Sequence, residues 1–151
     1  MTQKTKKPAA PVEAPPKAPP KAPPDLSTFD ILASNQEAGE EIEIRHPATG
    51  NKLDVHIRMA GPDSELQKQA RRWVVDSRSD RGLNRPMTDK ELDEESAEML
   101  ARMTVTWRNV VIDGQKIGFS TEAAKSLYLR FPFIREQVDH FAGRRANFMK
   151  A

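Results

Sequence analysis

The stretch that decides the fold runs from Thr88 to Phe119 and reads TDKELDEESAEMLARMTVTWRNVVIDGQKIGF. It begins with a capping-box pattern, in which the Thr88 hydroxyl accepts from the Glu91 amide and the Glu91 carboxylate reaches back. Acidic residues fill the first turns, where the helix dipole stabilises negative charge. Apolar residues then recur at spacings of three, four and seven, at Leu92, Met99, Leu100, Met103 and Trp107. This pattern predicts one buried face on a helix of about six turns.

The end of that helix is expected where β-branched residues accumulate, between Val105 and Val111. An Asp113-Gly114 turn follows, with Val111-Ile112 before it and Ile117 after it. This arrangement is typical of a small β-hairpin. Trp107 would then stack beneath that hairpin.

The composition restricts the class of protein. The chain has 151 residues and no cysteine, so it offers neither a disulfide framework nor a thiolate site. No apolar run approaches the roughly 20 residues that a membrane span needs. The lysine-bearing N-terminus lacks the apolar segment of a secretory signal. We therefore expect a soluble, cytoplasmic protein with one domain and a tail.

The net charge of +2 is unevenly distributed. Of the 24 basic residues, five are lysines in residues 1–24, which hold one glutamate and so carry a net charge of +4. The rest of the chain has 19 basic and 21 acidic residues, a net charge of −2. A body of that charge argues against a nucleic-acid-binding domain on electrostatic grounds.

Residues 1–24 also hold eight of the twelve prolines, in part as the near repeat APPKAPPKAPP. Such a composition cannot bury a core and favours polyproline II, which predicts a disordered Pro/Lys-rich tail at residues 1–25. The tail could be a ligand for a proline-recognition domain or an electrostatic tether. The simpler interpretation is a solubilising spacer.

The clearest strand signal lies between Glu40 and Ala60. Two runs that alternate apolar and polar residues flank a Gly-containing turn, with one face formed by Ile42, Ile44, Leu53, Val55 and Ile57. They predict an antiparallel hairpin at about 41–59 with one solvated face. His46 and His56 occupy polar positions, but zinc needs three or four ligands and no third is in view, so we expect no metal site.

Helices are expected on both sides of this hairpin. Residues 25–39 should form a short helix that stops at Gly39 and closes over the sheet edge. Asp63 and Ser64 can cap a second helix, which ends near residues 80–82 and carries an apolar stripe of Leu66, Ala70, Trp73 and Val74. Its opposite face is basic, with Lys68, Arg71, Arg72, Arg78 and Arg81. This face could contact phosphates. Because the body is slightly acidic, pairing with the acidic start of the Thr88 helix or with a partner protein is the preferred interpretation.

Two further helices should follow Phe119. Ser120 fits an N-cap for a helix that buries Ala124, Leu127, Tyr128 and Phe131. Pro132 fits the first position of the next helix, whose apolar residues are Ile134, Val138 and Phe141. The basic segment Arg144-Arg145-Ala146-Asn147-Phe148 comes last. Phe148 either folds back on the core or stays exposed as a partner contact.

No catalytic constellation can be placed in the sequence. There is no Gly-rich phosphate loop, no paired-histidine helix and no Ser-His-Asp arrangement. The carboxylates lie in exposed helical runs, without the burial or close pairing that tunes such groups for acid–base work. We therefore expect no catalytic residue, no cofactor and no enzymatic activity.

Four segments in this order resemble the tail assembly chaperones of long-tailed bacteriophages with non-contractile tails. They are HPATGNKLDVHIRMAGPDS (46–64), TVTWRNVVIDGQKIGFS (104–120), TEAAKSLYLRFPFIREQV (121–138) and Arg-Ala-Asn-Phe (145–148). The resemblance extends from about Leu26 to Phe148. The sequence departs from the family in its Pro/Lys-rich tail and at Arg108-Asn109, where a Gly or Lys-Gly is common.

The resemblance implies a non-enzymatic factor of the host cytoplasm that is absent from the mature virion. Such proteins coat the tape measure protein, keep its apolar helices soluble and recruit tail tube protein. Many are also made in a longer, frameshifted form. Met-rich and aromatic surfaces, with Met87, Met99, Met103, Met149 and Phe148, could adapt to apolar partners, although most of these methionines also suit a core. An exposed aromatic patch would allow self-association.

The sequence as a whole predicts an α+β fold, mainly α-helical, in one domain at residues 26–149. In it, the N-terminal hairpin packs on four to five helices. The expected partner-binding residues are Arg71, Arg72, Arg78, Phe141, Arg144, Arg145 and Phe148. One rival is a structural virion protein of the tail or head–tail junction, which would be found stoichiometrically in particles. The other is a small nucleic-acid-binding module, which would bind DNA with a steep dependence on salt.

The basic helix face gives a direct test. Arg71→Glu with Arg72→Glu should abolish binding to the tape measure protein without unfolding the domain, because it reverses the charge of exposed side chains. Pull-down measures the binding and circular dichroism the fold. If the doubly reversed protein still binds, this helix face is not the contact surface.

Overall fold

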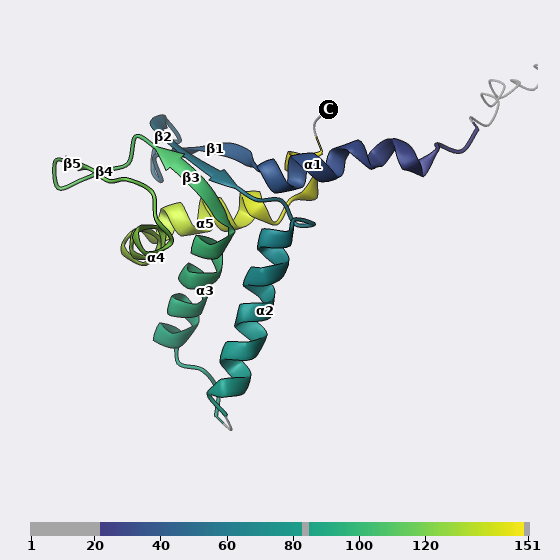
Figure 1. The fold of residues 1–151 in the computed structure, drawn as a ribbon. Helices are drawn as coiled ribbons and strands as arrows, with labels where there is room; N and C mark the ends of the chain where they lie inside the picture. Colours follow the sequence, from purple (N-terminus) through teal and green to yellow (C-terminus); the bar gives the residue numbers. More distant parts are fainter. Residues whose placement is uncertain (1–21, 83–84, 150–151) are drawn as a thin grey trace, which may run out of the picture.

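The computed structural model describes residues 22–82 and 85–149, without the side chains of residues 31–34. The disordered tail predicted at residues 1–25 therefore lies mostly outside the described residues. The described chain has an α+β fold (Figure 1). Its elements are η1 (Leu26–Phe29), α1 (Ile31–Ala38), β1 (Glu40–Arg45), β2 (Lys52–Met59), α2 (Glu65–Asp80), α3 (Asp89–Met103), β3 (Thr104–Arg108), β4 (Val111–Ile112), β5 (Gln115–Lys116), α4 (Thr121–Arg130), α5 (Pro132–Ala142) and η2 (Arg145–Phe148).

The main sheet has three antiparallel strands in the order β1-β2-β3, so the predicted two-stranded hairpin is incomplete. The predicted six-turn helix is too long, because α3 ends at Met103. The backbone is extended at Thr104, with φ −80° and ψ 131°. From there β3 pairs with β2, and Trp107 lies opposite Ile57. Three β-branched residues in a row at 104–106 favour the strand over another helical turn.

A bulge interrupts the hairpin of β1 and β2. Glu43 pairs with His56, but the next pair is Arg45 with Lys52, so β2 carries extra residues here. At this bulge, Asp54 adopts a left-handed backbone conformation, with φ 57°. Leu53 was predicted to share the apolar face with Val55 and Ile57. The bulge takes it out of that alternation, and it is 39% exposed.

The helix starts lie where the capping residues predicted them. The hydroxyls of Ser64, Thr88 and Ser120 each accept a backbone amide in the first turn, at 3.1, 3.2 and 3.0 Å respectively. Pro132 occupies the first position of α5. Gly39 ends α1 with φ 78°, and a Cβ there would lie 2.2 Å from the Met59 carbonyl oxygen. No residue with a side chain could make that close approach.

Helix α1 extends away from the sheet at one end of the molecule (Figure 1). Its last turn holds it to the β2–α2 connection: the Gly61 amide donates to the Gln36 carbonyl at 2.8 Å, and the Asp63 amide donates to Gln36 Oε1 at 3.2 Å. This end-on attachment differs from the expected docking over the sheet edge.

The predicted Asp113-Gly114 hairpin forms, with β4 paired to β5. Both turn residues have positive φ, 52° and 77°, as a type I′ turn requires. Trp107 lies against this hairpin as expected. Its Nε1 donates to the Ile117 carbonyl at 2.9 Å, and its ring meets Phe119 edge-on at 5.3 Å between centroids.

The core lies where the sheet meets α3, α4 and α5. Its largest fully buried side chains include Ile44, Ile57, Tyr128, Val138 and Phe148. Phe148 therefore folds back on the core, which decides between the two interpretations of that residue. Among the described residues, no helix is both long enough and apolar enough to cross a membrane.

One buried hydroxyl pair joins three elements. Thr104 Oγ1 lies 2.7 Å from the Tyr128 hydroxyl and 2.8 Å from the Leu100 carbonyl oxygen, to which it donates. Thr104 has a single hydroxyl proton, so the Tyr128 hydroxyl donates to Thr104. Burial raises the pKa of Tyr128, because the ionised phenol would be far from water. The pair ties the start of β3 to α4.

We expect Thr104→Val to lower the free energy of unfolding by about 1–3 kcal/mol, because the buried Tyr128 hydroxyl loses its oxygen acceptor and keeps only the Met59 sulfur, a weak acceptor at 3.9 Å. Tyr128→Phe in the Thr104→Val background should recover part of that loss by removing the orphaned group. Urea denaturation measures both, and Thr106→Val is the control at an exposed position of the same strand. A double variant less stable than Thr104→Val alone would show that the pair does not act in this way.

Candidate functional site

An open groove of about 460 Å³ lies between the hairpin of β1 and β2 and the C-terminal elements α5 and η2. The hairpin contributes one wall, with Ile42, Glu43, Arg45, His46 and Pro47. The other wall comes from Gln137, His140, Phe141, Arg144 and Asn147. The groove is therefore built from segments about 90 residues apart in the sequence, and it forms only when α5 packs on the edge of the sheet.

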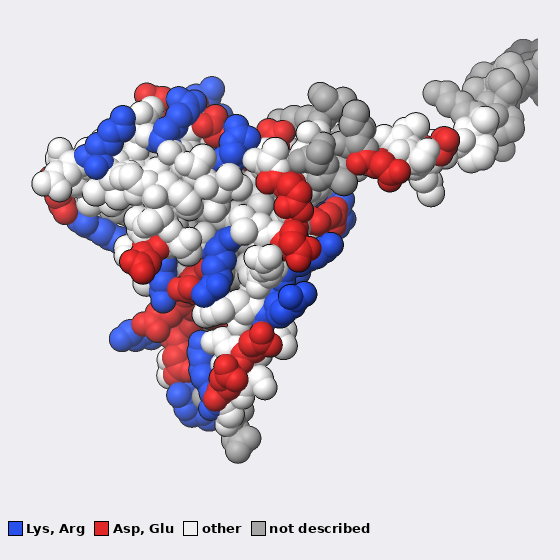
Figure 2. All heavy atoms as spheres, viewed as in Figure 1, with Lys and Arg blue, Asp and Glu red and all other residues white. Residues whose placement is uncertain are grey.

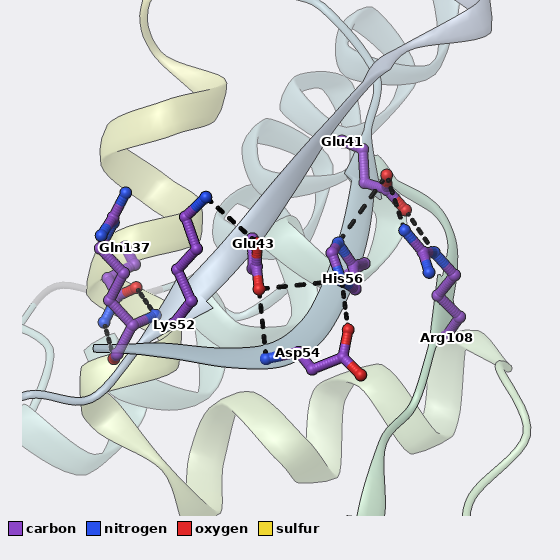
Figure 3. Close-up of polar contacts among 8 residues, drawn as sticks. Glu41, Glu43, Lys52, Asp54, His56, Arg108 and Gln137 are labelled. Carbon is purple, nitrogen blue, oxygen red and sulfur yellow. Dashed lines mark hydrogen bonds and ion pairs between the residues drawn. The ribbon is translucent and has the colours of Figure 1, made fainter. Parts of the chain in front are cut away.

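Gln137 fixes that packing. The Arg45 amide donates to Gln137 Oε1 at 2.9 Å, and Gln137 Nε2 donates to the Arg45 carbonyl at 2.8 Å (Figure 3). β1 is an edge strand, so these backbone groups have no strand partner on this side. One side-chain amide takes the place of a neighbouring strand. Sequence reasoning missed Gln137 because a glutamine on a helix carries no signal of this role.

The floor of the groove is apolar. Phe141 is half-buried and packs against Phe148, with ring centroids 5.4 Å apart. Asn147 Nδ2 donates to the Phe141 carbonyl at 3.0 Å, which holds η2 against the end of α5. Ile42 faces these residues from β1 and is also half-buried. The floor is thus a partly exposed apolar surface on a rigid base.

The rim of the groove carries mostly basic or titratable groups: Arg45, His46, His140 and Arg144, against the single carboxylate of Glu43. Two of them are held by the hairpin turn. Arg45 Nη1 donates to the Gly50 carbonyl at 3.1 Å, and His46 Nδ1 accepts the Ala48 amide at 3.1 Å. This combination suits an apolar segment of a partner protein with acidic flanks.

The seven residues expected to bind a partner do not form one surface. Phe141 and Arg144 line the groove, while Phe148 is buried behind its floor. Arg145 is directed to Asp63, with two hydrogen bonds of 2.7 and 2.9 Å. Arg71, Arg72 and Arg78 lie on α2, where all three are exposed. The predicted set therefore divides between the groove and the α2 face.

The expected charge pairing between α2 and the start of α3 is present, and Figure 2 shows acidic and basic side chains interleaved along the two helices. Arg78 forms a two-pronged contact with Glu95, at 3.0 and 2.6 Å. Arg81 lies 3.9 Å from Glu91. The Arg78 guanidinium holds the pKa of Glu95 below its usual range, mainly through these hydrogen bonds. Much of the basic face is thus used within the domain.

The solvated face of the sheet gathers a second polar cluster. His56 on β2 lies among the carboxylates of Glu41, Glu43 and Asp54 (Figure 3). Glu43, Asp54 and His56 are the described residues whose ligand atoms come close enough together to hold a metal ion. His46 is not among them, and its Nδ1 accepts the amides of Ala48 and Thr49 in the turn.

The ion pair of Arg78 and Glu95 predicts a loss of stability in acid. A carboxyl whose pKa is lower in the folded chain stabilises it above the unfolded pKa, about 4.3, and this contribution is lost as pH falls through the folded pKa. Glu95→Gln should therefore lose less unfolding free energy between pH 7 and pH 3 than the parent. Chemical denaturation at both pH values measures this, with Glu94→Gln as the exposed control. Equal losses in Glu95→Gln and the parent would contradict the assignment.

Comparison of this chain with protein-family models, curated proteins and solved structures gives no match.

Proposed function

We propose that this protein is a non-enzymatic assembly chaperone of bacteriophage tails. It binds the tape measure protein and recruits tail tube subunits during tail morphogenesis in the host cytoplasm. The proposal starts from the resemblance of the four segments between His46 and Phe148 to this class of protein. Those segments supply much of the core, including Ile57, Trp107 and Tyr128, so the resemblance concerns the body of the domain and not a peripheral motif.

The observation that carries the proposal is the groove between the hairpin and α5–η2. A chaperone for a long helical protein has to cover apolar side chains that would otherwise aggregate, and it has to release them later. A half-buried floor of Ile42 and Phe141 offers apolar contact without a deep, closed pocket. The basic rim adds contacts that are sensitive to charge and to salt.

The distribution of charge favours a protein partner over nucleic acid. Arg78 and Arg81 of α2 contact acidic residues of α3, and Arg145 contacts Asp63. Each such pair removes a cation from those available to phosphates. On α2, the described side chains of Lys68, Arg71 and Arg72 form no ion pair, and Arg71 donates instead to Gln67 Oε1 and to the Pro62 carbonyl, each at 3.3 Å. Three cations on one helix are too few for a phosphate-tracking surface.

The first experiment is co-expression with the candidate tape measure protein, the longest helical protein encoded beside this one. Solubility and co-purification are the readouts. The proposal requires that the long protein becomes soluble only when this chain is present and that the two co-purify. A long protein that stays insoluble, together with stoichiometric amounts of this chain in mature particles, would replace the chaperone role with a structural one.

The groove itself is tested by Arg144→Glu, which reverses one charge on its rim. We expect the amount of co-purified tape measure protein to fall by about tenfold or more, because a like charge would face the acidic flanks of the partner. Lys90→Glu is the matched control, since it makes the same charge change on an α3 side chain that is 87% exposed. Equal co-purification by the two variants would show that the groove is not the binding surface.

A further inference from the structure

We propose that Glu43, Asp54 and His56 form a binding site for a divalent transition-metal ion, with Zn²⁺ as its best-fitting occupant. The three residues join β1 to the bulge of β2 on the solvated face of the sheet. Each offers one ligand atom, and the three atoms lie within 4.8 Å of one another. A bound ion would clamp the two strands together at the point where their pairing is irregular.

The distances between the ligand atoms suit a metal. His56 Nε2 lies 2.9 Å from Asp54 Oδ1 and 3.9 Å from Glu43 Oε2. Ligand atoms on a tetrahedral zinc ion, each about 2.1 Å from the metal, lie about 3.4 Å apart. The two observed distances fall on either side of this value, so small rotations of the exposed Asp54 carboxylate and the half-buried Glu43 carboxylate bring all three atoms into place. Water would complete the coordination on the open side, where Asp54 is 79% exposed.

The second ring nitrogen of His56, Nδ1, also faces a carboxylate. His56 Nδ1 faces Glu41 Oε2 at 3.8 Å, and Glu41 is itself held by Arg108, whose Nε donates to Glu41 Oε1 at 2.9 Å (Figure 3). Metal-binding histidines commonly direct their other ring nitrogen to a carboxylate, which orients the ring and makes it a better ligand. His56 is set in that way, with Nε2 toward the proposed ion and a side chain only 13% exposed.

The bulge is what brings Asp54 to the site. The left-handed backbone at Asp54, φ 57°, directs the Asp54 amide to Glu43 Oε2 at 3.3 Å and its carboxylate to His56. A regular strand would keep Asp54 in the ladder opposite Arg45, two residues along from the pair of Glu43 and His56. The irregularity therefore assembles a set of ligands from both strands.

The charges at the site leave room for a cation. Three carboxylates surround one imidazole, and none of the three nearby cationic side chains contacts the proposed ligand atoms. Arg58, opposite Glu41, donates to the Gly39 carbonyl at 2.9 Å. Arg108 contacts Glu41, and Lys52 lies 3.9 Å from Glu43 Oε1, the oxygen that faces away from His56. One imidazole with two carboxylates favours Zn²⁺ over Mg²⁺ or Ca²⁺, which prefer oxygen ligands alone.

Calorimetric titration of the full chain, freed of metal by a chelator, with ZnCl₂ and separately with MgCl₂ tests the proposal. We expect one Zn²⁺ per chain and no response to Mg²⁺. Asp54→Asn and His56→Gln should each weaken Zn²⁺ binding by about tenfold or more. Asparagine tolerates the left-handed backbone, so Asp54→Asn removes the charged ligand with the bulge intact. His140→Gln, at an exposed histidine of α5, is the matched control and should bind Zn²⁺ as the parent does.

The nitrogen-15 shifts of the His56 ring give a second readout, because Zn²⁺ should change the signal of Nε2 and leave that of Nδ1 typical of a protonated nitrogen. The proposal is overturned if the parent protein does not bind Zn²⁺. It is equally overturned if Asp54→Asn and His56→Gln bind Zn²⁺ as tightly as the parent. The same holds if Zn²⁺ changes the ring nitrogen signals of His140 and not those of His56.

Discussion

The fold depends on one buried joint, where α3 ends and β3 begins. At Thr104 a single hydroxyl bonds both the Leu100 carbonyl of the last helical turn and the Tyr128 hydroxyl of α4. The adjacent Met103 carbonyl accepts the Ala60 amide at 2.9 Å, which fixes the end of β2 at the same point. Helix, sheet and α4 therefore share one set of hydrogen bonds, and neither the length of α3 nor the register of β3 can change without breaking them.

The position of the groove follows from that joint. With α4 fixed against Thr104, the Phe131-Pro132 break sends α5 back across the sheet, and Gln137 then reaches the edge of β1. Phe148 closes the arrangement by returning to the core under Phe141. The candidate partner surface is thus a consequence of core packing, because its floor and both of its walls are held by buried or hydrogen-bonded groups.

The local signals in the sequence predicted local structure well. The hydroxyls of Ser64, Thr88 and Ser120, the Asp113-Gly114 turn and the start of α5 at Pro132 all act within a few residues, and each is where it was expected. Pairing of α2 with the acidic start of α3 was also predictable, because only a short loop separates them. The strand β3 was missed because Met99, Met103 and Trp107 keep a helical spacing of four past the true end of the helix.

Features that depend on distant residues could not be predicted. Nothing near Gln137 indicates that its amide will pair with the backbone of Arg45, and nothing near Phe148 decides between burial and exposure. The bulge at Asp54 is likewise invisible in the sequence, because the residues around it keep their alternation of apolar and polar side chains. Both the groove and the cluster around His56 depend on such features, so neither could be predicted from the sequence.

Hydrogen–deuterium exchange of this chain, alone and with the tape measure protein, tests the central claim most directly. Binding in the groove should slow amide exchange in residues 42–47 and 140–147, where the two walls and the floor lie. Slower exchange along α2 with no change in the groove would move the binding surface to the basic helix face. No change at either place would contradict partner binding by the folded domain.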